Sequence, residues 1–112
     1  MSKTATNPNA QSIAQTINSQ ISIGTKMFLG ARDFAFGTTK DGMAYLRFKF
    51  GRGNRQALSV IYNEGIDLYS IELCRAKGRG LTLSFETETV SEGVYHDMLN
   101  RSLIEAAKKV SH

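Results

Sequence analysis

Residues 44–50 (AYLRFKF) place apolar side chains at every second position, with tyrosine, arginine and lysine between them. Successive side chains of a strand point to opposite faces of its sheet, so this stretch predicts a strand with one buried face and one face in water. The same period of two continues on both sides of it. It predicts four further strands, whose core-facing residues are Phe34 and Phe36; Leu58, Val60 and Tyr62; Tyr69, Ile71 and Leu73; and Leu81, Leu83 and Phe85.

Short turn sequences separate these strands. Residues 40–42 end in Asp-Gly, a strong hairpin signal, and residues 51–53 and 63–65 also contain glycine. Residues 76–78 form a plausible three-residue loop with Gly78 in the left-handed conformation. Because each connection is short, the chain is expected to form an antiparallel meander.

Counting through the loops predicts which residues face each other across neighbouring strands. The expected pairs are Leu46 with Leu58, Ala44 with Val60, Val60 with Tyr69, Leu58 with Ile71, Ile71 with Leu83, and Tyr69 with Phe85. All of them place apolar side chains on one face, whereas a slip by one residue would scatter these side chains over both faces.

Helices are expected at both ends of the chain. Asn7 can cap a helix over residues 8–21, with Pro8 at its first position and isoleucines at spacing four; Gly24 interrupts the apolar stripe. Residues 26–29 read as a short helix or turn.

The second terminal helix is expected to start at Ser91-Glu92, with Ser91 as its cap. Its predicted buried stripe is Tyr95, Met98, Leu99, Ser102, Leu103 and Ala106. The predicted fold is therefore α+β: a five-stranded antiparallel meander sheet with an N-terminal and a C-terminal helix packed on one face. Residues 1–6 read as a flexible tail and residues 7–112 as a single domain.

Composition sets the broad class of protein. The 112 residues fit one domain, and 41% hydrophobic and 21% charged residues argue against wholesale disorder. No apolar run approaches the ~20 residues of a membrane span, and the polar start lacks the apolar segment of a secretion signal. A single cysteine, Cys74, suits a reducing compartment. These features predict a cytoplasmic protein without a membrane partner.

The net charge of +4 is expected to be unevenly distributed. In a meander, alternate turns lie at the same end of the sheet, so the 51–53 and 76–78 loops should be neighbours. That end would gather Arg32, Lys49, Arg52, Arg55, Arg75, Lys77 and Arg79, with Asp33 as the nearby acid. The opposite end would gather Asp41, Glu64, Asp67, Glu86, Glu88 and Glu92, with Lys40 among them.

The seven cations form a candidate partner-binding surface for an acidic protein surface or a nucleic-acid backbone. The competing interpretation is that charges at turns and edges only keep the strands apart and in solution. Tyr45 is the one aromatic residue expected on the polar face of the sheet, whereas single-strand platforms stack bases on several aromatics. Nucleic-acid binding would therefore be directed at the backbone and tolerant of sequence.

Enzymatic constellations are sparse. His96 and His112 do not have metal-ligand spacing, and Cys74 is more typical of an ordinary sheet cysteine than of a nucleophile. The Gly-Arg-Gly triplets at 51–53 and 78–80 lack the helix that follows a phosphate-cradling loop. The sequence predicts no enzyme, no metal and no cofactor.

Two stretches carry a resemblance: residues 62–71 (YNEGIDLYSI) and residues 93–99 (GVYHDML), together with Leu29-Gly30-Ala31 before the first strand. They resemble small single-domain proteins carried by bacteriophages and mobile elements. What the resemblance implies is context, a small accessory protein in the host cytosol, and no site residue.

Two functions from different classes follow. The first is a non-enzymatic accessory protein that modulates a macromolecular partner, for example a host defence component, through the basic hairpin tips. The alternative is sequence-tolerant nucleic-acid binding through the same tips. A homodimer is compatible with either.

Overall fold

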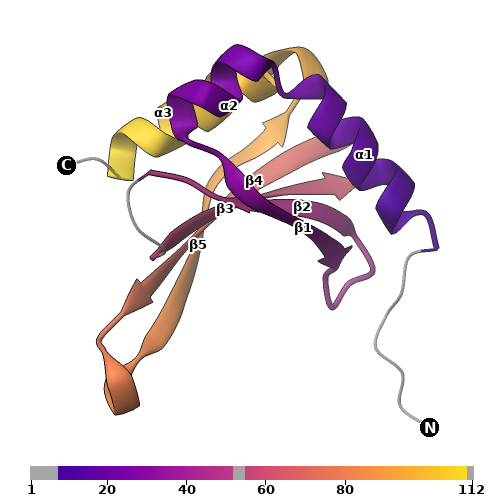
Figure 1. Ribbon diagram of the computed structural model, residues 1–112. Coiled ribbons are helices and arrows are strands. Elements are labelled where there is room, and N and C mark those ends of the chain that lie inside the picture. The colour runs from indigo at the N-terminus through magenta and orange to yellow at the C-terminus, as the bar shows by residue number, and fades with distance from the viewer. Residues whose placement is uncertain (1–7, 52–54, 111–112) are drawn as a thin grey trace, which may run out of the picture.

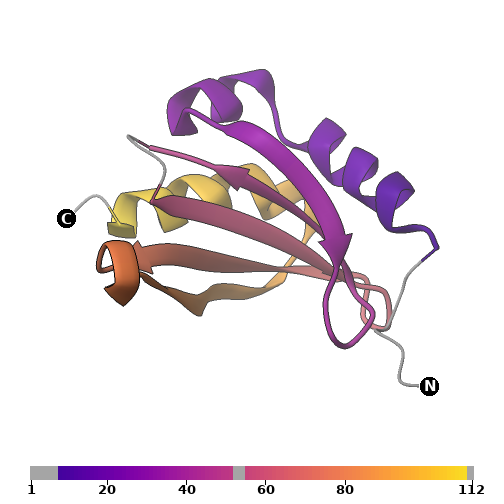
Figure 2. The same ribbon diagram turned by 60° about the horizontal axis from the view of Figure 1, so that its bottom comes forward.

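The computed structural model describes residues 8–51 and 55–110, without the side chain of Val110 (Figure 1). Five antiparallel strands form one sheet in the order β1-β2-β3-β4-β5. Figures 1 and 2 show the helices on one side of this sheet. The strands are β1 Arg32–Thr38, β2 Ala44–Lys49, β3 Gln56–Asn63, β4 Leu68–Lys77 and β5 Ser84–Val94. The helices are α1 Ala10–Gln20, α2 Ile23–Leu29 and α3 Leu99–Val110, with short 3₁₀ turns η1 Gly80–Thr82 and η2 His96–Met98. The predicted α+β meander is confirmed.

The N-terminal helical region is divided differently from the prediction. Pro8 lies in a turn before α1, and Asn7 lies outside the described residues. The break comes at Ser22, whose hydroxyl accepts the Thr25 N–H at 3.1 Å and so caps α2; Gly24 lies inside that helix. Gly30 ends α2 with φ 66°, a conformation that glycine adopts without strain.

The core lies between the three middle strands and the helices. The largest side chains that are fully buried come from α1, from β2, β3 and β4, and from α3: Ile17, Phe48, Leu58, Val60, Ile71, Leu99 and Leu103. On the edge strand β1, Phe34 packs against Phe48 with ring centroids 5.3 Å apart, yet it remains 41% exposed. The core is thus built by β2, β3 and β4, and the edge strand β1 adds only a partly exposed ring.

The predicted register of the middle strands is wrong by two residues. Leu46 pairs with Val60, and Val60 pairs with Ile71. The cause at the β3–β4 turn is its length: Asp67 takes a left-handed φ of 56° and donates its N–H to the Asn63 carbonyl at 2.8 Å, which makes a four-residue loop. An even shift leaves every side chain on its predicted face, so the composition of this part of the core was predicted correctly.

The prediction for the fifth strand is wrong in register and in face. The chain forms η1 after Gly78, and β5 starts only at Ser84, opposite Lys77. Leu81 is fully exposed, and Leu83 and Phe85 are 45% and 67% exposed, so none of the three belongs to the core. The buried core residue of β5 is Val94, which pairs with Tyr69, and the partly buried Val90 packs against the same core.

The start of the C-terminal helix is also later than predicted. Ser91 pairs with Ile71 inside β5 and caps no helix, and α3 begins at Leu99 after the η2 turn. Tyr95 and Met98 are consequently exposed. The rest of the predicted stripe is buried as expected: Leu99, Ser102, Leu103 and Ala106.

This arrangement of β5 makes a testable prediction. Leu81→Ser is expected to change the free energy of unfolding by less than about 0.5 kcal/mol, because Leu81 is fully exposed. Val94→Ala is expected to cost about 1.5–2 kcal/mol, because Val94 is buried and each buried methylene contributes ~0.8 kcal/mol. Urea unfolding of both variants measures the two values. If Leu81→Ser lost more stability than Val94→Ala, residues 81–85 would form the core-facing strand that the sequence predicts.

Candidate binding surface

Arg55, which follows the 51–53 loop, lies against the 76–78 loop, whereas residues 52–54 lie outside the described residues. The Arg55 guanidinium donates to the Gly78 carbonyl at 2.8 Å, and the Ala76 N–H donates to the Arg55 carbonyl at 2.8 Å. Arg32 donates to the Gly51 carbonyl at 2.9 Å, which joins the start of β1 to the same end. Arg52 lies outside the described residues. The other six predicted cations are all near this end of the sheet: Arg32, Lys49, Arg55, Arg75, Lys77 and Arg79.

The predicted separation of charge is wrong for two glutamates. Glu86 lies 2.9 Å from Lys77, and Glu88 lies 3.4 Å from Arg75, so both sit at the basic end. The cause is the register of β5, which pairs residues 84–88 with the last residues of β4. Lys49 also forms an ion pair, with its Nζ 3.5 Å from the Asp33 carboxylate. Three of the predicted cations are therefore at least partly neutralised.

Two cations of this end, Lys49 and Arg55, also lie with Arg47 on the open face of the sheet, away from the helices. Lys49, Ala57, Cys74 and Thr87 follow one another across four neighbouring strands. Because Ala57 and Cys74 are small, they leave a hollow of about 400 Å³ in this row. The hollow is lined by Arg47, Lys49, Arg55, Gln56, Ala57, Cys74, Phe85 and Thr87. This hollow is called the open-face groove below.

The guanidinium of Arg47 is held in place at the groove. Its Nε donates to the Ser59 hydroxyl at 2.9 Å, and its Cζ lies 5.1 Å from the centre of the Tyr45 ring. Within the described part of the chain, no carboxylate lies in ion-pair distance of Arg47 or Arg55. Neither guanidinium is neutralised by a carboxylate there, although Nη2 of Arg55 donates to the carbonyls of Ala76 and Gly78.

Phe85 was missed as a surface residue by the sequence analysis. It follows Leu81 and Leu83 at spacing two, which is the pattern of a buried strand face. In the structure it pairs with Ala76 and points to the open face, where it lines the groove with 67% of its surface exposed. Arg47 was placed on this face from the alternation of residues 44–50, but it was not counted among the binding residues.

The residues considered for catalysis are not brought together. His96 is exposed on η2, and Cys74 is a half-buried free thiol in the groove. Among residues 8–51 and 55–110, no three His, Cys, Asp or Glu side chains are grouped as a metal site would require. No helix in the described part of the chain is long and apolar enough to cross a membrane.

Comparison with protein-family models, curated proteins and solved structures found no match to this chain.

Proposed function

We propose that this chain is a non-enzymatic binding module that holds single-stranded nucleic acid along the open-face groove, without preference for sequence. The observation that supports this most is the composition of the groove: Arg47, Lys49 and Arg55 line the same hollow as the exposed ring of Phe85. Cations supply the attraction for phosphates, and an exposed ring supplies a surface for a base.

The geometry of Arg47 supports the same ligand. Its guanidinium is a flat plane fixed on one side by the Tyr45 ring and at Nε by Ser59. Bases of single strands stack on arginine planes as well as on aromatic rings. Arg47 and Phe85 therefore offer two stacking surfaces where the sequence predicted only Tyr45. Both accept any base, which accounts for the expected tolerance of sequence.

The helices do not favour binding in a duplex groove. Helix α1 carries no charged residue, and α3 carries Arg101 in its first turn, the acidic Glu105 in its middle and two lysines at its C-terminal end. A helix that reads the major groove contacts phosphates with basic residues along its length. A single strand on the open face of the sheet is therefore the preferred ligand.

One observation favours the second candidate function, an accessory protein that modulates a protein partner. The β4–β5 hairpin projects beyond the rest of the sheet (Figure 1), and its tip exposes Leu81 beside Arg79. Exposed apolar side chains that gather within a polar and charged surface, as Leu81 does with the 45% exposed Leu83, are typical of a protein–protein contact. This function retains the phage or mobile-element context of the resemblance, and both candidates suit a cytosolic location.

Salt dependence tests the proposal and separates the two candidates. With a fluorescent oligothymidine, anisotropy should show binding that weakens with salt. The slope of log K against log salt should be about −2, since each of three contacted phosphates contributes about −0.7 on a single strand. An absence of binding at low salt would contradict the proposal. A lysate pull-down that retains a protein after nuclease treatment would favour the protein partner instead.

A further inference from the structure

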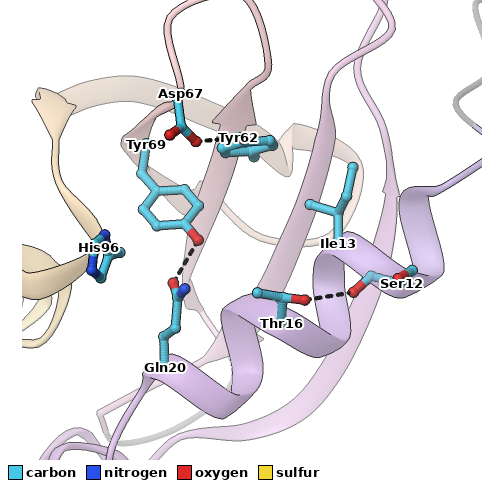
Figure 3. A pocket seen from close by; sticks show the side chains of 8 residues that line it. All are labelled: Ser12, Ile13, Thr16, Gln20, Tyr62, Asp67, Tyr69 and His96. Atoms are coloured by element: carbon cyan, nitrogen blue, oxygen red, sulfur yellow. Dashed lines mark hydrogen bonds between the residues drawn. The ribbon is translucent and has the colours of Figure 1, made fainter.

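A cavity of about 290 Å³ lies on the helix-covered side of the sheet, opposite to the face of the open-face groove (Figure 3). It is bounded by α1, by the ends of β3 and β4 at their shared turn, and by η2. From the sequence, Tyr62 and Tyr69 were assigned to the core face and Asp67 to the acidic end of the sheet, and none of them to a binding site. The four polar side chains that matter here are Gln20, Tyr62, Asp67 and Tyr69.

Two tyrosines form the aromatic walls of the cavity. The rings of Tyr62 and Tyr69 are 5.5 Å apart at an angle of 56°. The Tyr69 hydroxyl donates to Gln20 Oε1 at 2.5 Å, and the Tyr62 hydroxyl donates to the Asp67 carboxylate. Figure 3 shows both hydrogen bonds at the border of the cavity. The two rings are therefore fixed in position before any ligand binds.

The cavity has the electrostatics of a cation site. Of the described residues that line it, Asp67 alone is charged when His96 is neutral. The hydrogen bond to Asp67 raises the pKa of Tyr62 to about 12, and burial raises the pKa of Tyr69, so both phenols stay protonated at neutral pH. Helix α1, which forms one wall, contributes no charge. The carboxylate of Asp67 therefore dominates the field in the cavity.

Asp67 also keeps hydrogen-bonding capacity for a ligand. Its Oδ1 accepts the Tyr62 hydroxyl, which leaves Oδ2 and the phenol oxygens as acceptors at the same cavity. The carboxylate is positioned by the turn, in which the Asp67 N–H donates to Asn63 at 2.8 Å. The Asp67 carboxylate and the phenol oxygens lie beside the Tyr62 and Tyr69 rings, an arrangement that favours a flat ligand with several N–H donors.

We propose that this cavity binds a guanidinium group, carried either by a free small molecule or by an arginine side chain. A guanidinium is planar and weakly hydrated, it stacks on tyrosine rings, and its N–H groups match a carboxylate. An ammonium group has no plane to stack. An anion would meet the Asp67 carboxylate, and the described lining contains no lysine or arginine to offset it.

Titration with matched probes tests this site by NMR of the ¹⁵N-labelled protein. Agmatine represents a free molecule, and N-acetyl-arginine amide represents a side chain; either one should shift the amide signals of residues 62–69 with a Kd near or below about 1 mM. N-acetyl-citrulline amide, which has a neutral urea of the same shape, should bind about tenfold more weakly. Equal binding of citrulline, or no binding of either guanidinium probe, would overturn the proposal.

Asp67→Asn provides the matched variant. Asparagine tolerates the left-handed conformation that Asp67 adopts, so the turn should be retained while the charge is lost. The variant should bind the guanidinium probes about tenfold more weakly, whereas Glu72→Gln, on the other face of the sheet, should bind as the unmodified protein does. Undiminished binding by Asp67→Asn would refute the site. If that variant failed to fold, the comparison with citrulline in the unmodified protein would still decide the question.

Discussion

Arg47→Glu combined with Lys49→Glu is expected to weaken binding of oligothymidine by at least about 100-fold at low salt. Each substitution replaces a groove cation by an anion, so two attractions to phosphate become repulsions. Thermal stability should stay near that of the unmodified protein, because the cations are at the surface and exposed ion pairs contribute little. A glutamate at position 47 can also accept the Ser59 hydroxyl, which leaves this buried group with a partner. Fluorescence anisotropy and a thermal melt measure the two quantities.

Lys108→Glu combined with Lys109→Glu is the matched control. It removes the same four units of charge from the net +4, but both lysines are exposed at the end of α3 and neither lines the groove. Its binding should fall by less than about tenfold, through the loss of general attraction alone. If the two double variants lost affinity equally, only net charge would be acting, and the groove would have no specific role.

The basic surface predicted at the hairpin tips illustrates how much of a charge pattern the sequence can predict. That the loops after β2 and β4 lie at one end of the sheet depends only on the meander, and Arg55, which follows the first of these loops, contacts Gly78 in the second. The neutralising glutamates depend on the register of β5, and that register depends on the η1 turn. A turn of this kind leaves no clear signal in the sequence, because Leu81 and Leu83 continue the alternation that precedes it. The strand order, and with it the cations at one end of the sheet, was therefore predicted, whereas the register of β5, and with it the neutralising glutamates, was not.

The middle of the sheet was predicted better, because the register errors there are even and leave each side chain on its predicted face of the sheet. A shift of two residues exchanges the partners of Val60 but keeps its side chain in the core. The open-face groove could not be predicted in the same way. It requires Phe85 beside Thr87 and opposite Ala76, and only the observed register brings them there. The cavity at Asp67 likewise depends on a four-residue turn, whereas the predicted pairing of Val60 with Tyr69 implies a turn of two residues.

Ile71 is the core residue whose truncation is expected to lower the stability of the protein most. Its side chain is fully buried in the middle of β4, where it pairs with Val60 on one side and with Ser91 on the other. It belongs to the same buried cluster as Ile17 of α1 and Leu99 of α3. A cavity at Ile71 would therefore lie between the sheet and both terminal helices, where rigid elements on several sides limit collapse around it.

Ile71→Ala is expected to lower the free energy of unfolding by roughly 2–5 kcal/mol, from lost burial together with the cavity that remains. Urea unfolding followed by circular dichroism measures the change. Ser70→Ala is the control from the neighbouring position: Ser70 points to the other face and is only half-buried, so its loss should be nearly neutral. A loss below about 0.5 kcal/mol for Ile71→Ala would mean that β4 presents its other face to the helices. In that case Ser70 and Glu72 would occupy the core, and the assignment of groove and cavity to opposite sides of the sheet would be wrong.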